Sequence, residues 1–477
     1  MATQSLSLDH YDILALGFGE AAKYIVWTFA KEGKRCAVIE RKWLGGSCPN
    51  IACLPSKNVI HSASVAHLAS EAKRFGLPSL NSKLASEHGI VQMTAVRDLK
   101  REMVNGLVEM HEGKLKDTGA ELIWGNGKFV GAKKVEVTAP DGSKSLLTAD
   151  KVVICTGSRA RIEDIPGLKE SNPLTHIEIL ELDEVPKHLV IIGGGYVGLE
   201  FAQAMKRLGA EVTIVERNAR LLKSEDDDVS SSLHGILEKE GVTILFSTHI
   251  TSVNGTSGDS VTLEGTVSGV ATKITATHIL CATGRLPNTS DIELELAGVA
   301  LTPNGHIETD ESLQTSAEGV FAVGDCAGSP HFTHIAFDDF RIVRDTILNK
   351  PTVPKRKSGR QVPFTLFTAP ALAHVGLREH EATERGIKYR ILKVPMAAFL
   401  NTRTIGETEG FAKALIAEDD TILGFTALGA GAGELLPVVQ LAMKKGLLYT
   451  EIAEMVITHP TLSEGLIALF MSVPKKS

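Results

Sequence analysis

Two glycine-rich stretches decide the fold, GFGEAA at residues 17–22 and GGGYVG at residues 193–198. Each follows an apolar run, residues 11–16 and 189–192, that predicts a buried strand, and each opens a helix-compatible segment. One such turn would be weak support, because glycine-rich turns occur in many loops. Two of them in the same strand–turn–helix context predict an α/β fold with two Rossmann-like dinucleotide-binding domains.

Both units carry the small residues and the acid that dinucleotide binding requires. The first glycine allows the tight turn, the second lets the backbone approach a pyrophosphate, and the third small residue allows close packing of helix on strand. The acid ends the next strand at the same distance from the first glycine in both units, where it is expected to accept hydrogen bonds from ribose hydroxyls. The residues assigned to these sites are Gly17, Gly19, Ala22 and Glu40 in the first unit and Gly193, Gly195, Gly198 and Glu216 in the second. The alternative is a doubly wound fold with ordinary tight turns.

Composition excludes several classes of protein. With 477 residues, 43% hydrophobic and 22% charged, the chain has the length of about three globular domains, and it is not disordered, collagenous or a coiled coil. The net charge is −7 and no Lys/Arg-rich run occurs, so we expect no nucleic-acid partner. No apolar run is long enough to cross a membrane, and the opening MATQSLSLDH does not resemble a secretory signal, so we expect a cytoplasmic protein. Six cysteines are too few for a disulfide-stapled scaffold, which leaves catalysis as the expected use of any disulfide.

The expected domain edges follow from the strand and helix signals. Residues 121–155 alternate as in a β-meander that ends in an apolar strand, and a matching strand at 277–282 closes the second nucleotide unit. A Pro- and Lys-rich stretch, 350–359, predicts a linker, and mixed signals beyond it predict a separate α+β domain. The elements expected in that domain are strands at 363–367, 413–416 and 422–427 and helices at 434–445 and 462–471. We therefore expect four segments, 1–160, 161–285, 286–355 and 356–477.

A third acid bears on which dinucleotide the first unit holds. Gly319 and Gly324 flank a short apolar strand, 320–323, which delivers Asp325 to a loop at its carboxyl end, where open α/β sheets bind their ligands. If the chain returns to the first domain here, Asp325 can hold the ribityl hydroxyls of FAD. The alternative is an ordinary turn aspartate.

The second unit is expected to hold NADH or NADPH. Glu216 favours NADH, because a carboxylate repels the 2′-phosphate of NADPH. Arg217 and Arg220 follow closely and act in the opposite direction, since they offset that repulsion. We predict that NADH has the higher kcat/KM.

Cys48 and Cys53 lie in GGSCPNIACLPSK, residues 45–57, just after the first nucleotide unit. A thiol pair at this spacing can form a disulfide across a distorted helical turn, where a helix N-terminus and Lys57 would stabilise a thiolate. Such a pair beside a flavin can accept two electrons and pass them on by thiol–disulfide exchange. A structural zinc site needs about four ligands, and there is no second pair at C-x2–4-C spacing, so no metal site is predicted. Unrelated buried cysteines are the other alternative, and that is the interpretation for Cys36, Cys155, Cys281 and Cys326.

A thiol that loses and regains its proton during thiol–disulfide exchange needs a proton carrier that titrates near neutral pH. Among the 16 histidines, His459 is singled out by its context THPTLSE, residues 458–464. Glu464 in that stretch can orient the imidazole and raise its basicity. The alternative is a surface histidine that precedes a helix.

Taken together, these motifs resemble the flavoprotein disulfide reductase family, the pyridine nucleotide-disulfide oxidoreductases that include dihydrolipoamide dehydrogenase, glutathione reductase and mercuric reductase. The resemblance covers essentially the whole chain, with the motifs in the family's order. It implies bound FAD, NADH or NADPH as the reductant, and a homodimer. It describes the segments as an FAD-binding domain in two parts, 1–160 and 286–355, an NAD(P)-binding domain, 161–285, and a C-terminal α+β dimerisation domain, 356–477.

The resemblance also implies a role for each site residue. Cys48 would be the interchange thiol that meets substrate, and Cys53 the charge-transfer thiol beside the flavin. Lys57 would lie near flavin N5 and pair with Glu200, which follows the second glycine turn. The C-terminal His-Pro…Glu motif would act on the cysteine pair of the other subunit, so the active site would be shared. The remaining matches are His459 and Glu464 in that motif, Asp325 in the second FAD motif, and the connecting turns Thr156-Gly157 and Ala282-Thr283-Gly284.

Departures from the family bear on the substrate. Mercuric reductases carry a vicinal cysteine pair near the C-terminus and tend to lack an equivalent of His459, whereas this chain has His459 and no cysteine after Cys326. Typical lipoamide enzymes read GGTCLNVGC where this chain reads GGSCPNIAC. The stretch FTHIAFDDFRIV, 332–343, looks closer to a bacterial branch linked to oxidant resistance and to copper or mercury reduction.

The expected reaction passes hydride from NAD(P)H through FAD to the Cys48–Cys53 pair. The acceptor beyond the pair would be a disulfide, a thiol-bound metal ion or an oxidant. The alternative is an NAD(P)H oxidase or quinone-type reductase in which the flavin reacts directly and the cysteines are not a relay.

Overall fold

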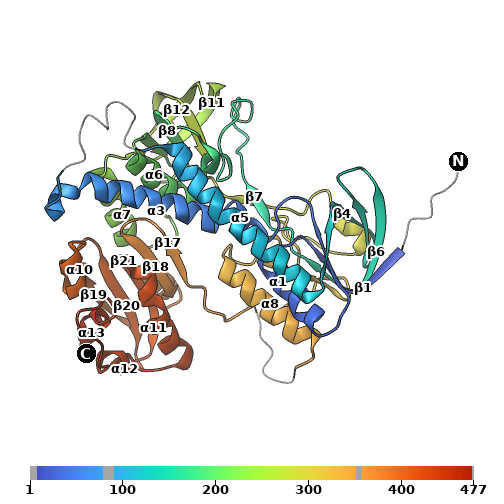
Figure 1. The fold of residues 1–477 in the computed structure, drawn as a ribbon. Coiled ribbons are helices and arrows are strands. Elements are labelled where there is room, and N and C mark those ends of the chain that lie inside the picture. The colour runs from blue at the N-terminus through green and yellow to red at the C-terminus, as the bar shows by residue number, and fades with distance from the viewer. Residues whose placement is uncertain (1–7, 79–90, 351–356, 475–477) are drawn as a thin grey trace.

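The computed structural model describes residues 8–78, 91–350 and 357–474, and Figure 1 shows their arrangement. Residues 1–7 of the N-terminal stretch MATQSLSLDH and residues 351–356 of the expected linker lie outside the described residues. Among the helices described, none combines the length and the apolar character that a membrane-spanning helix needs.

The first glycine turn joins β1 (Leu8–Leu16) to α1 (Glu20–Lys31) within a seven-stranded sheet. β1 pairs in parallel with β2 (Cys36–Glu40) on one side and with β6 (Lys144–Ile154) on the other. β16 (Val320–Ala322) pairs in parallel with β6, so the chain returns to this sheet after the second nucleotide unit. β2 is buried at every position, which is why its sequence reads as a continuous apolar run up to the final Glu40.

The β-meander expected over residues 121–155 is only partly correct. β4 (Asn126–Gly131), β5 (Lys134–Thr138) and β6 are antiparallel neighbours, whereas β3 (Glu121–Trp124) pairs in parallel with β2. β3 follows the long helix α5 (Met93–Thr118), and a crossover helix brings the chain back parallel to an earlier strand. Alternation of polar and apolar residues does not distinguish the two pairings, so the sequence pattern alone was insufficient here.

Helices α1, α5 and α8 (Thr333–Ile347) on this sheet share one core. They lie near one another (Figure 1), and Ile25, Leu115 and Phe340 from these helices pack in one cluster with the strands. α3 (Cys53–Ser70) instead extends towards the second unit, where its Val59 joins the core that contains α6. The helix that begins at Cys53 therefore connects the two nucleotide units.

The second glycine turn joins β8 (His188–Ile192) to α6 (Tyr196–Leu208) in a four-stranded parallel sheet. Its other strands and its second helix are β9 (Glu211–Val215), β10 (Thr243–Leu245), β14 (His278–Cys281) and α7 (Asp227–Lys239). A three-stranded antiparallel sheet was not predicted, and it consists of β11 (Thr248–Thr256), β12 (Ser260–Val267) and β13 (Val270–Ala276). Many positions in its strands are exposed, so they lack a strong apolar pattern. The chain enters and leaves the second unit through an antiparallel ribbon of β7 (Ser158–Ala160) and β15 (Arg285–Pro287).

The C-terminal region is an α+β unit, as predicted. Its antiparallel sheet has the order β17 (Phe364–Leu366), β18 (Ala371–Gly376), β21 (Ile422–Gly429), β20 (Phe411–Ala417) and β19 (Tyr389–Pro395). Its helices are α9 (Glu379–Glu384), α10 (Leu400–Ile405), α11 (Ala432–Lys445), α12 (Tyr449–Ala453) and α13 (Gly465–Met471). The three strands and two helices expected here are present, whereas β18, β19 and the short helices α9, α10 and α12 were not predicted.

Candidate active site

Both glycine turns place the backbone where no side chain fits. Gly17 and Gly193 have φ values of 92° and 109°, in the left-handed region that favours glycine. A Cβ on Gly17 would lie 2.5 Å from the carbonyl oxygen of Cys155, and one on Gly193 would lie 2.6 Å from that of Ala282. Cys155 and Ala282 directly follow β6 and β14, so the two turns are equivalent in packing as well as in sequence.

The two acids brace these turns. Glu40 accepts the N–H of Phe18 at 2.9 Å, and Glu216 accepts the N–H of Gly194 at 2.7 Å. The second oxygen of Glu216 accepts the N–H of Asn218 at 2.8 Å. The second oxygen of Glu40 accepts the N–H groups of the three residues that follow it, 41–43. Both side chains are buried. Each carboxylate therefore joins the glycine turn to the loop after the second strand, a contact that spacing alone did not predict.

Asp325 lies at the carboxyl end of β16, in the short helix η4 (Gly324–Ala327). Ser158 donates a hydrogen bond to Asp325 Oδ2, and Arg285 Nε lies 3.7 Å from the same oxygen. Arg285 Nε also donates to Ser158 Oγ at 2.6 Å, and burial lowers the pKa of Arg285. Arg285 was not predicted as a site residue, although it directly follows the Gly284 connecting turn.

The residues at both turns fit a bound dinucleotide. A Cβ on Gly157, Gly195 or Gly284 would meet nothing within 4 Å, so the backbone there is open to a ligand. The buried hydroxyl of Thr156 has no hydrogen-bond partner among the described residues. Open glycine backbone and an unpaired buried hydroxyl are what a pyrophosphate or a ribose hydroxyl would bind.

Cys48 and Cys53 lie on two helical segments that meet at a short break. α2 (Ser47–Asn50) carries Cys48, and α3 begins at Cys53. Asn50 Nδ2 donates to two carbonyl oxygens of the preceding loop at 2.8 Å each, which holds the start of α2 in place. Both cysteines are free thiols, and the interaction between the two side chains shifts the pKa of each. The break in the helix therefore brings the two sulfurs together.

The two thiols differ in their electrostatic environment. The pKa of Cys53 is lowered to about 6, and the largest cause is the hydrogen bond from Cys48. The Thr333 hydroxyl, 3.3 Å from Sγ, and the Lys57 ammonium group lower it further. Burial and the Glu200 carboxylate act in the opposite direction and raise this pKa. The pKa of Cys48 is raised, because its thiol donates to Cys53 and because it is buried. At neutral pH Cys53 is therefore the thiolate and Cys48 the thiol. Thr333, the first residue of α8, was not singled out from the sequence.

Lys57 and Glu200 form the ion pair that the resemblance implied. Lys57 Nζ lies 2.7 Å from Glu200 Oε2, and Glu200 Oε1 accepts the N–H of Phe367 at 2.9 Å. Lys57 Nζ also lies 4.8 Å from the ring centroid of Phe367. The three residues come from α3, from α6 and from the loop after β17, and they line a cleft of about 290 Å³. The pair thus joins the cysteine helix to the second unit and to the C-terminal region.

His459 and Glu464 contact each other near the C-terminus. His459 Nδ1 lies 3.0 Å and 2.9 Å from the two carboxylate oxygens of Glu464. The His459 side chain is 63% exposed, and within the described part of the chain no hydrogen bond joins it to either cysteine. A single chain therefore presents an oriented imidazole to its surroundings rather than to its own thiol pair.

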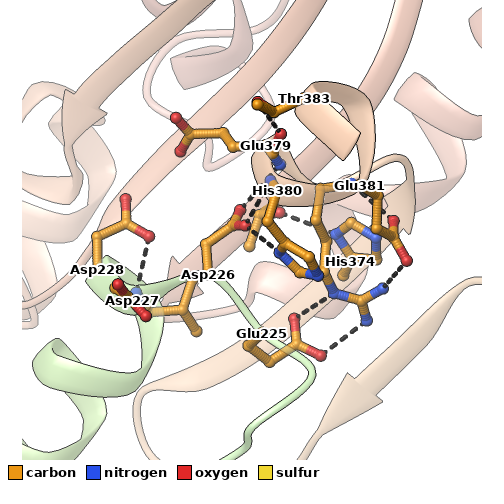
Figure 2. Close-up of polar contacts among 12 residues, drawn as sticks. Glu225, Asp226, Asp227, Asp228, His374, Glu379, His380, Glu381 and Thr383 are labelled. Carbon is orange, nitrogen blue, oxygen red and sulfur yellow. Dashed lines mark hydrogen bonds and ion pairs between the residues drawn. The ribbon is translucent and has the colours of Figure 1, made fainter. Parts of the chain in front are cut away.

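A cluster of carboxylates joins the second unit to the C-terminal region (Figure 2). Asp226 and Asp228 at the start of α7 and Glu379 of α9 have oxygens close enough together to hold a cation. The Lys413 ammonium group of β20 lies 2.8, 2.8 and 2.6 Å from these three carboxylates. Figure 2 also shows His380 turned towards Asp226, with Nδ1 2.7 Å from Oδ1. The ammonium group takes the place of a metal ion here, and the cluster connects two domains by ion pairs.

A thiol pair beside a Lys–Glu pair, between two dinucleotide-type turns, defines a redox enzyme of the disulfide reductase class. Residues 11–339 match the family described as pyridine nucleotide-disulphide oxidoreductase, and residues 362–469 match the dimerisation domain of that family. The chain belongs to the pyridine nucleotide-disulfide oxidoreductases. Membership implies an oxidoreductase that uses a flavin and a pyridine nucleotide, and the dimerisation domain indicates a homodimer.

Several relatives align over nearly the whole chain. Escherichia coli RclA, described as a probable pyridine nucleotide-disulfide oxidoreductase, is 31% identical over 98% of this chain and 100% of its own. Dihydrolipoyl dehydrogenase of Mycobacterium tuberculosis is 33% identical over 96% of this chain and 97% of its own, and mercuric reductase of Lysinibacillus sphaericus is 33% identical over 96% and 82%. A solved structure of the HOCl-induced flavoprotein disulfide reductase RclA from E. coli, as its Cu(II) complex, matches with a TM-score of 0.87 at 30% identity, over 97% of this chain and 99% of that chain.

Proposed function

We propose that this enzyme uses NADH or NADPH, through bound FAD and the Cys48–Cys53 pair, to reduce a disulfide, a thiol-bound metal ion or an oxidant. The observation that carries the proposal is the position of Cys53, whose sulfur lies 3.3 Å from the Thr333 hydroxyl oxygen and close to the Lys57 ammonium group, so that its pKa is lowered while that of Cys48 is raised. An ionised sulfur next to a protonated one allows one thiol to exchange with substrate while the other holds the charge.

The two nucleotide units would hold the two cofactors. FAD would bind segments 1–160 and 286–355, and the nicotinamide dinucleotide would bind segment 161–285, while 356–477 would form the dimer. FAD when bound supplies two-electron transfer between the nicotinamide and the dithiol. The FAD-holding residues would be Gly17, Gly19, Ala22, Glu40, Lys57, Thr156, Gly157 and Asp325. The nicotinamide-holding residues would be Gly193, Gly195, Gly198, Glu200, Glu216 and Gly284.

With a disulfide as acceptor, the chain's own residues account for each bond change. His459 of the partner subunit takes the proton of Cys48, whose sulfur then attacks the substrate and breaks its S–S bond. The leaving thiolate takes a proton from the imidazolium, which Glu464 of the partner subunit orients. The Cys53 thiolate next attacks the Cys48 sulfur, which releases the second thiolate and leaves a Cys48–Cys53 disulfide. Both electrons then reside on the substrate, and Lys57, held by its carboxylate partner, stays beside the pair throughout.

NADH is the proposed preferred reductant. The buried Glu216 carboxylate is held at the second turn by Gly194 and Asn218. Arg220 forms an ion pair with Asp227 and donates to the carbonyl oxygen of Lys223 at 2.8 Å, so its charge is already engaged. We expect kcat/KM with NADH to exceed that with NADPH by about tenfold or more. A clear advantage for NADPH in steady-state assays would refute this preference.

The dithiol relay is tested with Cys48→Ser. The wild type is first screened by stopped-flow flavin reoxidation with lipoamide, glutathione disulfide, mercuric and cupric ions and quinones. Cupric ion is included because the RclA structure that matches this chain is a Cu(II) complex. We expect Cys48→Ser to lose at least about 100-fold in turnover with the preferred acceptor. Cys281→Ala, a buried cysteine of β14, is the matched control. Full turnover in Cys48→Ser would instead favour an oxidase or quinone-type reductase in which the flavin reacts directly.

A further inference from the structure

Three buried ionisable side chains in contact with one another lie beside the cysteine peptide. Lys23 Nζ of α1 lies 2.7 Å from Glu20 Oε2 on the same helix and 3.1 Å from His111 Nε2 on α5. The Glu20 and Lys23 side chains are 15% and 8% exposed, and His111 is 2% exposed. The reaction proposed above uses none of the three.

The hydrogen bonds of His111 determine the charge on each of these three side chains. His111 Nδ1 lies 2.6 Å from the carbonyl oxygen of Leu107, which can only accept, so Nδ1 carries the hydrogen and Nε2 accepts from the Lys23 ammonium group. Burial and the charge of Lys23 lower the pKa of His111, which keeps the ring neutral. Trp27 stacks on that ring, with centroids 5.8 Å apart. Lys23 is therefore a positive charge held in one place, paired with the Glu20 carboxylate.

The same group of three side chains lies next to the loop that carries Cys48. A Cβ on Gly45 would lie 3.0 Å from His111 Cε1, and a Cβ on Gly46 would lie 2.7 Å from Gly19 Cα. Gly19 is the N-cap of α1, and Gly46 is the N-cap of α2. The starts of the two helices, which carry Glu20 and Cys48, therefore lie against each other.

The surroundings of Cys48 act on it in opposite directions. The interaction with Cys53 and burial are the largest causes of the raised pKa of Cys48. The Thr333 hydroxyl opposes them, and the Glu20 carboxylate adds a smaller contribution that raises the pKa further. α8 packs against α1 at this end through aromatic rings that contact Tyr24. The titratable and charged groups on the elements packed around Glu20 and Cys48 include Lys23 and Tyr24 on α1, His111 on α5, Cys53 and Lys57 on α3, and Asp338, Arg341 and Arg344 on α8. Arg341 and Arg344 lie over the rings of Phe337 and Phe340.

We propose that Glu20 strengthens the preference of the reduced pair for the form with Cys48 protonated and Cys53 ionised, and that Lys23 and His111 are positioning residues that set the strength of its field. The inference rests on the proposed function, because it gives a purpose to the asymmetry of the two thiols. A carboxylate beside Cys48 disfavours a second negative charge there, and Lys23 partly neutralises that carboxylate. Cys48 then becomes a nucleophile only when a base removes its proton, which limits its oxidation between turnovers.

Two substitutions with opposite expected signs test this inference. The FAD-loaded enzyme is reduced with a phosphine, and the rate of Cys48 alkylation by iodoacetamide is measured against pH, with tandem mass spectrometry assigning the label to Cys48 or Cys53. Glu20→Gln removes the negative charge, so the midpoint of the profile should fall by about 0.5 to 1 pH unit. Lys23→Gln removes the compensating charge but keeps a donor for His111, so the midpoint should rise by a similar amount. The matched control is Glu32→Gln at the exposed end of α1, which should leave the profile unchanged.

Opposite shifts support the inference, because a general disturbance of the loop does not change sign with the charge removed. Equal midpoints in the variants and the wild type, or shifts in the same direction, would overturn it. Lys23→Gln decides the question alone if Glu20→Gln does not fold, since its midpoint must rise. Full turnover in Cys48→Ser would refute the proposed function instead, and the alkylation profile does not depend on the electron acceptor.

Discussion

Thr333→Val removes one stabilising contact from the Cys53 thiolate while keeping the shape of the side chain. The Thr333 oxygen lies 3.3 Å from Cys53 Sγ, and its hydroxyl is one cause of the pKa of about 6 for Cys53. A hydrogen bond to a charged group contributes about 1.5–3 kcal/mol, and we take about 1 kcal/mol here because sulfur is a weak acceptor. At about 1.4 kcal/mol for each pKa unit, the pKa of Cys53 should rise by about 0.7.

The assay follows the charge-transfer absorbance of the Cys53 thiolate with bound FAD in the dithiol-reduced enzyme, as a function of pH. The thiolate is present above the pKa of Cys53 and is lost below it, so the band should disappear around pH 6 in the wild type and at a higher pH in Thr333→Val. Thr346→Val on the same helix is the matched control, since its hydroxyl donates to the carbonyl oxygen of Ile342 at 2.9 Å. An unchanged or lowered midpoint in Thr333→Val would show that this hydroxyl does not stabilise the thiolate.

Two further predictions concern stability. Gly46→Ala should lower the free energy of unfolding by about 2 kcal/mol or more. The reason is that φ is 81° at this position and the new Cβ would lie 2.7 Å from Gly19 Cα. An unchanged midpoint in urea titrations would contradict this packing. Burial and Arg378 lower the pKa of His374 to about 4, so the unfolded chain binds a proton below about pH 6.5 that the native state does not. The free energy of unfolding should therefore decrease as the pH falls from about 6.5 to about 4, by about 2 kcal/mol at pH 5. His374→Asn should lack this part of the decrease. Equal pH profiles of stability for the variant and the wild type would contradict the prediction.

The cysteine peptide is held from three directions, which has consequences for any variant in this region. Gly46 packs on the first glycine turn, and Lys57 is paired with Glu200 of the second unit. Glu200 in turn binds the backbone of Phe367, in the loop after β17. A substitution at Glu200 would therefore affect both the charge beside Cys53 and the contact between the second unit and the C-terminal region.

Features that depend on spacing along the chain were predictable. The conformation required at Gly17 and Gly193 is a local property of a tight turn, and the distance between Cys48 and Cys53 is limited by the few residues that join them. The expected pairs Lys57–Glu200 and His459–Glu464 are present, although the first came only from the family resemblance. Strand direction was not predictable in the same way: β3 lies parallel to β2, and alternation of polar and apolar residues carries no information about direction.

By itself, the sequence determined that this protein has two dinucleotide-type units and a close pair of cysteines. The family resemblance implied that Cys53 is the charge-transfer thiol, but only the tertiary structure supplied the contacts that favour the negative charge on its sulfur. Thr333 lies 280 positions from Cys53 along the chain, and Glu200 lies 143 positions from Lys57, yet each pair is in direct contact. Electrostatic interactions and hydrogen bonds depend on distance in space and on burial rather than on separation in sequence. The ionisation of each thiol is therefore a property of the packed domains and not of the peptide that carries it.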